Sequence, residues 1–366
     1  MEAIIWGLFI SLNIIQIGYW ALFVLVQSRH AAPVNAAPPG ISVIICAHDE
    51  EKNLRALIPL LLNQDHPNFE IIVVEDRSND GTFDFLLAET SKYPNLKMVQ
   101  VRSKPDYLPG KKYALTLGIK AAAHDLVLLT EPDCRPAGNS WVTAMAENFN
   151  SQTDITLGSA TFSSNKTLLN IFLRFENILT TINYFTWAKI GLPYMGIGRN
   201  LAYRKQLFLD NKGFNKHLAS LTGDDRLFVN QHASGSNTTV AEDPRTVIYS
   251  QSVNTINGFI SQKKEAISSA KQFRVKHQLI LIPFYLTSAI WLPVITLTLA
   301  FAFSWWILLV LFVRWMLIIF AFARFSKTYQ VPYPLAWVPV QDIFYNIMAL
   351  VLMPAGLFTS KRVWKI

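Results

Sequence analysis

The chain has 366 residues, enough for about two domains, and its composition is strongly apolar. Hydrophobic residues make up 51% of the sequence and charged residues only 16%, whereas charged residues are about a quarter of a typical soluble domain. This balance favours a protein that is partly embedded in a membrane. The net charge of +8 suits anionic lipid headgroups or an anionic substrate, but the sequence lacks a clustered basic stripe with base-stacking aromatics, so we expect no nucleic-acid partner. Two cysteines, Cys46 and Cys134, are too few for a disulfide framework.

The first long segment, 4–26, is apolar and carries no charge, which predicts a helix that crosses a hydrocarbon core of about 30 Å. A secretory signal peptide is the alternative, because residues rich in Ala and Pro follow. The acidic Glu2 and the length of the apolar run favour a transmembrane helix within 1–30. Arg29 follows the run, so the positive-inside rule places the next domain in the cytoplasm. Residues 31–40 are predicted to form a semi-rigid linker.

Short apolar runs then alternate with helix-like segments. Strands are predicted at 41–47, 69–74, 96–101 and from Leu126, with helices near 54–62, from Thr82, and at 111–123. Strands and helices that alternate at this spacing predict a parallel sheet with helices on both faces.

Acidic residues follow three of the predicted strands, at the point where each strand ends. The pairs are Asp49 with Glu50, Glu75 with Asp76, and Glu131 with Asp133. Ligands of open α/β sheets bind beyond the carboxyl ends of the strands, and two carboxylates two residues apart can hold a divalent cation there. One such pair would indicate only a solvated turn, whereas three pairs at one edge predict a functional site.

The region 140–250 has a less regular pattern. Glycines at Gly196 and Gly198 permit a close approach of the backbone to another group. Further on, Asp224 and Asp225 stand together at the predicted start of a helix, where a helix cap is the simpler explanation for an acidic residue.

Residues 254–278 mix apolar and basic side chains, which predicts a basic amphipathic helix on the membrane surface or, alternatively, a solvated helix packed on the main domain. Residues 279–323 contain one charge, Arg314, and are too long for a single span. They predict two transmembrane helices with a turn near 303–304, with Arg314 facing protein rather than lipid.

A last apolar stretch, 335–358, contains Pro339 and Asp342. As a third span of the tail it would export the basic residues at the end of the chain, against the positive-inside rule. A re-entrant or interfacial segment would avoid this conflict. The sequence leaves both open and predicts two to three membrane segments in 279–366.

Five motifs, taken together, resemble the membrane-anchored family 2 glycosyltransferases of bacterial type. They occupy 43–51, 71–82, 110–115, 131–133 and 223–225, and the similarity covers about residues 40–275. The resemblance implies a GT-A fold, which is a Rossmann-like α/β domain with a mainly parallel sheet, here over 41–253. It would lie in the cytoplasm between transmembrane helices at both ends of the chain, in a multi-pass protein of the inner (cytoplasmic) membrane.

The resemblance also implies a role for each motif. A nucleotide-sugar donor would contact the residues Cys46, Ala47, His48, Glu50, Asp76, Lys111 and Glu131. In this set, the backbone of 46–48 and the side chain of Asp76 would face the base, and Lys111 would steady the phosphates. Asp133 would bind Mg²⁺ or Mn²⁺ that bridges the diphosphate, and Asp225, beside Asp224, would be the general base.

The activity implied is inverting, metal-dependent transfer of a sugar, with UDP as the family-level expectation for the nucleotide. A polymerising synthase of this family would carry Gln-X-X-Arg-Trp, but the nearest stretch, 262–266, lacks both Arg and Trp. We therefore expect transfer of one sugar to a lipid-linked or membrane-proximal glycan acceptor. Glu131 stands where the family has Asp, so Asp133 must carry more of the metal binding. A processive synthase and a catalytically silent nucleotide-sugar sensor are the alternatives.

Overall fold

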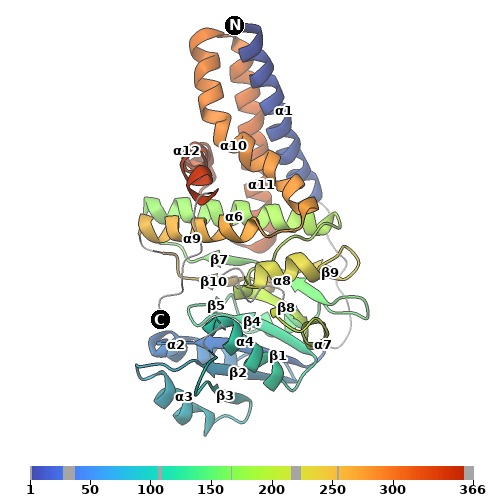
Figure 1. The fold of residues 1–366 in the computed structure, drawn as a ribbon, viewed down its shortest axis with the longest axis vertical. Coiled ribbons are helices and arrows are strands. Elements are labelled where there is room, and N and C mark those ends of the chain that lie inside the picture. The colour runs from blue at the N-terminus through green and yellow to red at the C-terminus, as the bar shows by residue number, and fades with distance from the viewer. Residues whose placement is uncertain are drawn as a thin grey trace. The chain divides into compact units, whose positions relative to one another are not determined.

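A computed structural model describes residues 2–27, 38–105, 109–165, 167–215, 224–253 and 255–357 (Figure 1). Its contacts divide the chain into two compact units. The helical unit comprises Met1–His30, Ser164–Ile190 and Ser252–Ser360, and the sheet unit comprises Ala31–Ser163, Gly191–Gln251 and Lys361–Ile366. Arg29, Gly223 and the basic residues at the end of the chain, which are Lys361, Arg362 and Lys365, lie outside the described residues.

The sheet unit is built on a seven-stranded sheet in the order β3-β2-β1-β4-β8-β6-β9. Its strands are β1 (Ile41–Ala47), β2 (Phe69–Glu75), β3 (Leu96–Gln100), β4 (Leu126–Thr130), β6 (Ile155–Leu157), β8 (Leu201–Arg204) and β9 (Thr238–Val240). Strands β1 to β4 pair in parallel, and β8 runs antiparallel to β4 and β6. The predicted α/β class with a mainly parallel sheet is therefore confirmed.

A smaller sheet of three strands, in the order β5-β10-β7, lies in the same unit. Its strands are β5 (Arg135–Pro136), β7 (Ala160–Phe162) and β10 (Ile248–Ser250). The helices of the unit are α2 (Glu51–Leu62), α3 (Thr82–Thr90), α4 (Gly110–Ala121), α5 (Trp141–Ala146), α7 (Lys205–Asp210) and α8 (Asp224–His232), with short 3-10 turns η1 (Gly198–Asn200) and η3 (Pro244–Thr246).

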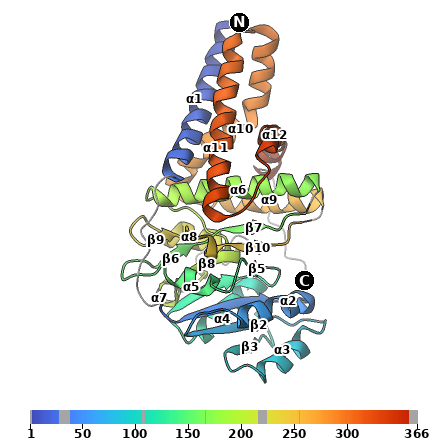
Figure 2. The ribbon, with the colours of Figure 1, turned by 180° about the vertical axis from the view of Figure 1, so that it is seen from behind.

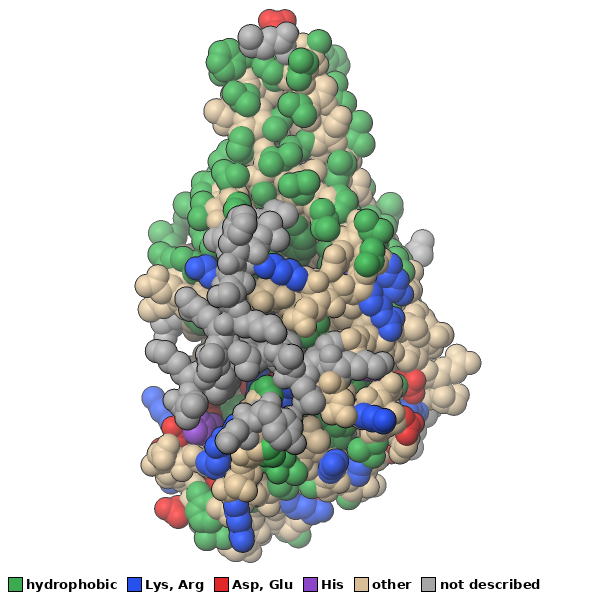
Figure 3. All heavy atoms as spheres, in the orientation of Figure 1, with side chains coloured by type: hydrophobic (Ala, Val, Ile, Leu, Met, Phe, Trp, Pro, Cys, Tyr) green, Lys and Arg blue, Asp and Glu red, His purple; other side chains and the backbone are tan. Residues whose placement is uncertain are grey.

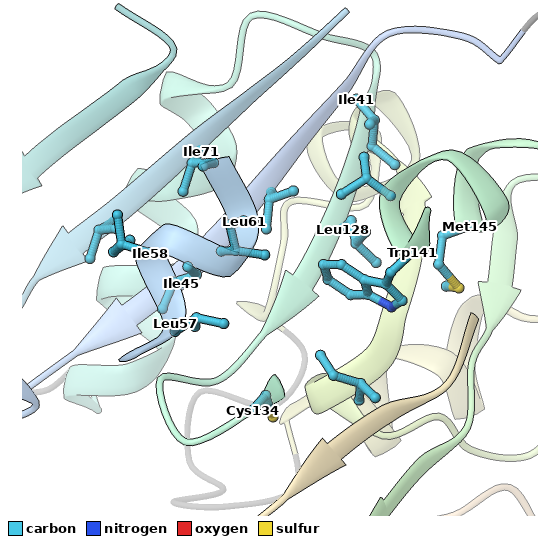
Figure 4. Close-up of a cluster of buried hydrophobic side chains, with 14 of the residues drawn as sticks. Ile41, Ile45, Leu57, Ile58, Leu61, Ile71, Leu128, Cys134, Trp141 and Met145 are labelled. Atoms are coloured by element: carbon cyan, nitrogen blue, oxygen red, sulfur yellow. The ribbon is translucent and has the colours of Figure 1, made fainter. Parts of the chain in front are cut away.

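The core of the sheet unit forms where α2 and α5 cover one face of the sheet (Figure 4). Ile45 and Leu128 project from β1 and β4 toward Leu57 of α2 and Trp141 of α5, and all four are fully buried. Burial of each such side chain contributes about 1.5–3 kcal/mol. On α4, a Cβ atom at Gly118 would lie 2.7 Å from Ile44 and 2.8 Å from Val74, so glycine lets this helix approach β1 and β2 closely.

The helical unit contains α1 (Glu2–Gln27), α6 (Leu168–Lys189), α9 (Ile256–Ala270), α10 (Val275–Phe301), α11 (Trp305–Tyr329), η4 (Leu335–Trp337) and α12 (Val338–Leu357), as Figure 2 shows. Among the described residues, four helical stretches are long and apolar enough to cross a membrane: α1, α10, α11 and Leu335–Leu352. The surface of the long apolar helices is largely hydrophobic (Figure 3). These helices make the predicted membrane segments at both ends of the chain plausible.

Two features of the helical unit differ from the sequence predictions. Helix α6 falls in the region 140–250 that has no clear pattern, and its contacts group it with the apolar helices. The helix predicted over 254–278 is instead two helices, α9 and the start of α10. The Gln278 side chain donates hydrogen bonds to the carbonyl oxygens of Lys271 (3.0 Å) and Phe273 (2.9 Å), which stabilises the turn between them.

The apolar tail folds as two long helices joined at 302–304, as predicted, and then α12. Helix α12 continues through Pro339 because this proline lies in the first turn, where it costs no backbone hydrogen bond. Arg314 of α11 is buried in protein, as predicted, and forms a bidentate pair with Asp342 of α12.

Candidate functional site

Two of the acids that follow β1 and β2 stabilise the turns after these strands. The Asp49 carboxylate accepts a hydrogen bond from the Asn79 backbone N–H (2.6 Å), and Glu75 accepts one from the Ser78 N–H (2.6 Å). These two acids therefore tie the turns after the strands together. Asp49 itself has a φ of 55°, a left-handed conformation that Asp tolerates at such a turn.

The residues expected to face a nucleotide base come together at these turns. The His48 ring nitrogen Nδ1 lies 2.6 Å from the Asp76 carbonyl oxygen, and the Asp76 N–H donates to the Ala47 carbonyl oxygen at 2.8 Å. The Asp76 carboxylate accepts from Arg77 Nε at 2.8 Å. A Cβ atom at Gly110 would lie 2.9 Å from Asp76 Oδ2, so α4 begins directly beside this carboxylate.

Helix α4 presents two consecutive lysines to two different acids. Lys111 Nζ lies 2.5 Å from Glu131 Oε1, beyond the end of β4. Burial acts to raise the pKa of Glu131, but Lys111 and the charges of Arg199 and Arg226 lower it below its usual value. Glu131 is therefore a charged carboxylate with one oxygen already engaged.

The second lysine, Lys112, is almost completely buried, and its Nζ lies 3.1 Å from Asp224 Oδ1 at the start of α8. A buried charge is costly unless it is paired, so this contact fixes the start of α8 against α4. Burial raises the pKa of Asp224 to about 6.

The adjacent acid, Asp225, points to a different place. A Cβ atom at Gly198 would lie 1.8 Å from Asp225 Oδ2, so the carboxylate occupies the space that only glycine leaves open in η1. Burial raises the pKa of Asp225, and Lys111 and Arg226 oppose this rise. A carboxylate with a raised pKa accepts a proton more readily.

The motifs converge around the end of β1. Burial raises the pKa of the Cys46 thiol to about 12, and the charges that act on this thiol are those of Lys111, Asp225, Asp76 and Glu131. Glu50 belongs to the same cluster, because burial raises its pKa and Asp133 and Glu131 raise it further. Residues of all five motifs therefore lie in one charged site.

The donor groups present suit a divalent cation that takes most of its ligands from a substrate. Burial raises the pKa of Asp133 and the Glu131 charge raises it further, whereas the charge of Arg199 opposes this rise. Among the described residues, no group of three or more His, Cys, Asp or Glu side chains is arranged to hold a metal. Mg²⁺ commonly binds through one or two carboxylates together with substrate phosphates, and Asp133 fits that pattern.

Three residues near the site were not singled out from the sequence. They are Lys112, which pairs with Asp224, Arg199, whose charge acts on Glu131 and Asp133, and Asn200, which is fully buried. Asn200 Oδ1 accepts from the Trp141 indole at 3.2 Å. In the sequence, only the two consecutive lysines at 111–112 and the Arg-Asn pair after Gly198 could have drawn attention to these residues. Neither pattern indicates which side chains the residues contact.

Comparisons with known proteins agree with this architecture. Residues 42–210 match the model of the family described as "Glycosyl transferase family 2". A probable glycosyltransferase of Bacillus subtilis, YdaM, is 29% identical over 178 residues, which are 46% of this chain and 41% of that protein. The poly-beta-1,6-N-acetyl-D-glucosamine synthase of Staphylococcus epidermidis is 28% identical over 109 residues, which are 30% of this chain and 24% of that protein. The chain thus matches less than half of the length of these relatives.

A solved structure shares the fold. The mannosyltransferase PcManGT of Pyrobaculum calidifontis, in complex with GDP-Man and Mn²⁺, superposes with a TM-score of 0.62 over 97% of each chain, at 15% sequence identity. The overall fold is therefore shared with this protein of known structure. The family match over residues 42–210 and the relatives of similar sequence support a glycosyl transferase family 2 domain in this part of the chain.

Proposed function

We propose that the protein is an inverting, metal-dependent glycosyltransferase that moves one sugar from a nucleotide-sugar, with UDP as the expected nucleotide, to an acceptor hydroxyl. The observation that carries the proposal is the convergence of Asp225, Asp133 and Lys111 at the carboxyl end of β1. Such a site can bind a diphosphate on one side of the sugar and accept a proton on the other. The family match and the GDP-Man and Mn²⁺ complex of PcManGT support this reading.

Each residue has a chemical task in the proposal. The backbone of Cys46, Ala47 and His48 and the Asp76 carboxylate bind the base. The Asp225 carboxylate takes the proton of the acceptor hydroxyl as the oxygen attacks the anomeric carbon, and its buried position makes it a better base. Attack from the side opposite the leaving group inverts the anomeric centre.

The leaving group is a nucleoside diphosphate, and its charge has to be stabilised. Mg²⁺ or Mn²⁺ held by Asp133 would supply Lewis-acid stabilisation of that charge. Glu131 and Lys111 act as a pair at the same edge, and Glu50 belongs to the same charged cluster, because the charges of Asp133 and Glu131 raise its pKa. Asp224 acts indirectly: through Lys112 it holds the first turn of α8, and hence Asp225, in place.

The acceptor is proposed to be lipid-linked or close to the membrane, because the described residues include four candidate membrane spans. We place the protein in the cytoplasmic membrane with the sheet unit on the cytoplasmic side, where nucleotide-sugars are made. Membrane lipid is then a further partner. The basic residues that precede α10, such as Lys271 and Arg274, support this orientation under the positive-inside rule.

The test uses full-length protein purified in detergent, with a panel of UDP-, GDP-, dTDP- and CMP-sugars with and without Mn²⁺. We expect metal-dependent binding of one donor. Asp225→Asn should keep that binding but lower the transfer rate by about 10²–10⁴-fold, because the acceptor loses its base. Asp133→Asn should lose the effect of Mn²⁺ on donor binding.

Asp84→Asn is the matched control, because Asp84 is an exposed acid on α3. Donor binding by the wild-type protein without any turnover would instead indicate a nucleotide-sugar sensor. Long polymer made from a single donor would contradict transfer of one sugar.

A further inference from the structure

The turn η1 holds an arginine beside the proposed metal ligand. The Arg199 guanidinium donates a hydrogen bond to Ser250 Oγ and lies 5.0 Å from the centroid of the Phe162 ring. Gln251, which follows Ser250 in the chain, donates its backbone N–H to the Asp133 carboxylate. Two consecutive residues, Ser250 at the end of β10 and Gln251 after it, therefore bind the guanidinium and the carboxylate.

The backbone that carries Arg199 is rigid. Asn200 donates hydrogen bonds to the carbonyl oxygens of Ser159 (2.8 Å) and Thr246 (2.7 Å) and accepts one from Trp141. A Cβ atom at Gly158 would lie 2.5 Å from the Asn200 side chain, so this amide is tightly enclosed. Arg199 is thus presented from a preorganised turn, which reduces the entropy lost when it binds a ligand.

The charge of Arg199 is available to a ligand, whereas that of Lys111 is engaged. Lys111 is paired with Glu131 at 2.5 Å. Within the described part of the chain, no carboxylate lies within ion-pair distance of the Arg199 guanidinium, although its charge acts on both Asp133 and Glu131. The charge of the neighbouring Arg226 lowers the pKa of Asp225 and of Glu131. It is not among the main influences on the pKa of Asp133.

We propose that Arg199 binds the diphosphate of the nucleotide donor and stabilises its charge as it leaves, a task that the sequence motif assigned to Lys111. This inference rests on the proposed function. A guanidinium presents a planar set of N–H donors that matches phosphate oxygens, and such charge-assisted hydrogen bonds are stronger than neutral ones. The position suits the role, because the charge of Arg199 acts on Asp133 and the preceding residue, Gly198, contacts Asp225.

The test compares binding of UDP and GDP with binding of uridine and guanosine by calorimetry, in the presence of Mn²⁺, using full-length protein in detergent. For the diphosphate that the wild-type protein binds, we expect Arg199→Gln to lower the affinity by about tenfold or more, because charged hydrogen bonds are lost. Arg199→Lys keeps the positive charge but loses the planar set of N–H donors. Its affinity for the diphosphate should lie between those of the wild type and Arg199→Gln. Affinity for the matching nucleoside should be unchanged.

Lys92→Gln is the control, because it removes one positive charge from an exposed turn just after α3 and should bind like the wild-type protein. Equal binding of the diphosphate by wild type and Arg199→Gln would overturn the inference while leaving the proposed function in place. An equal loss of diphosphate and nucleoside would also overturn it, since it would show a structural role for Arg199. A wild-type protein that binds no diphosphate would overturn the proposed function and the inference together.

Discussion

Lys111 and Lys112 are neighbours in the sequence but pair with acids of different motifs. Lys111 contacts Glu131 beyond β4, and Lys112 contacts Asp224 at the start of α8. Successive residues of a helix point about 100° apart, so the first turn of α4 connects the proposed donor side of the site with the proposed base side. Asp225 gains its position from this connection and from the space at Gly198.

The space at Gly198 gives a prediction at the scale of one residue. In Gly198→Ala, the new Cβ would lie 1.8 Å from Asp225 Oδ2 and must displace the carboxylate. A misplacement of about 1 Å can cost about 100-fold in rate, so we expect kcat to fall by about 10–100-fold while donor binding is retained. Steady-state kinetics and donor titration check this result.

Gly138→Ala is the matched control, because a Cβ atom at Gly138 would meet no atom within 4 Å. If Gly198→Ala had the wild-type kcat, this would contradict the proposal that Asp225 acts as the base from its position beside Gly198.

At the scale of elements, the helices of the helical unit are joined by a buried polar cluster. Arg314 of α11 forms a bidentate pair with Asp342 of α12, and its guanidinium lies 4.2 Å from the centroid of the Trp291 ring in α10. Gln16 of α1 donates to Thr287 Oγ1 of α10 at 2.6 Å. The Trp315 indole also donates to Asp342, at 3.1 Å. Helix α1 thus shares one set of polar contacts with α10, α11 and α12 at the other end of the chain.

This cluster predicts a large loss of stability when one partner is removed. Asp342→Leu leaves the Arg314 charge buried without its counter-ion, which costs about 3–5 kcal/mol. We expect a lower unfolding temperature in detergent. The double variant Arg314→Met with Asp342→Leu removes both charges and should recover much of the loss.

Phe312→Leu is a suitable control in α11, the helix that carries Arg314, because Phe312 is exposed in the structure. A double variant that is no more stable than Asp342→Leu would show that packing, rather than the unpaired charge, causes the loss.

At the scale of the whole molecule, residues 42–210 match the family 2 model and the described residues include four candidate membrane spans, so the orientation of the sheet unit is open to test. Cys46 and Cys134 are both free, and burial raises the pKa of each thiol to about 12. A thiol with so high a pKa stays protonated near neutral pH and reacts slowly. The native cysteines therefore give little background in a labelling experiment.

A single cysteine at an exposed position then reports the side on which the sheet unit lies. We expect Lys92→Cys to resist a membrane-impermeant thiol reagent in intact cells and to react after the cells are opened. The wild-type protein is the control for the background. Labelling of Lys92→Cys in intact cells would contradict a cytoplasmic sheet unit.

The sequence by itself determined the features that depend on local pattern. Apolar runs of about five residues and helical spacing located β1 to β4 and the helices between them, because hydrophobic periodicity is a local signal. The same reasoning placed three acidic pairs at one edge of a parallel sheet, and two helices around the turn after Phe301. Helix α6 escaped prediction, since polar residues such as Asn177 and Asn183 are buried in it and blur its apolar face.

Only the tertiary structure decided which charged groups meet. Lys111 and Glu131 are 20 residues apart in sequence, and Arg314 and Gln16 are 298 apart, so no local pattern could pair them. The structure thereby separates Asp49 and Glu75, which stabilise turns, from Asp133 and its neighbours in the charged site. Side-chain partners depend on how strands and helices pack in three dimensions, because a charge is stabilised by whatever lies within a few ångströms of it rather than by its neighbours along the chain.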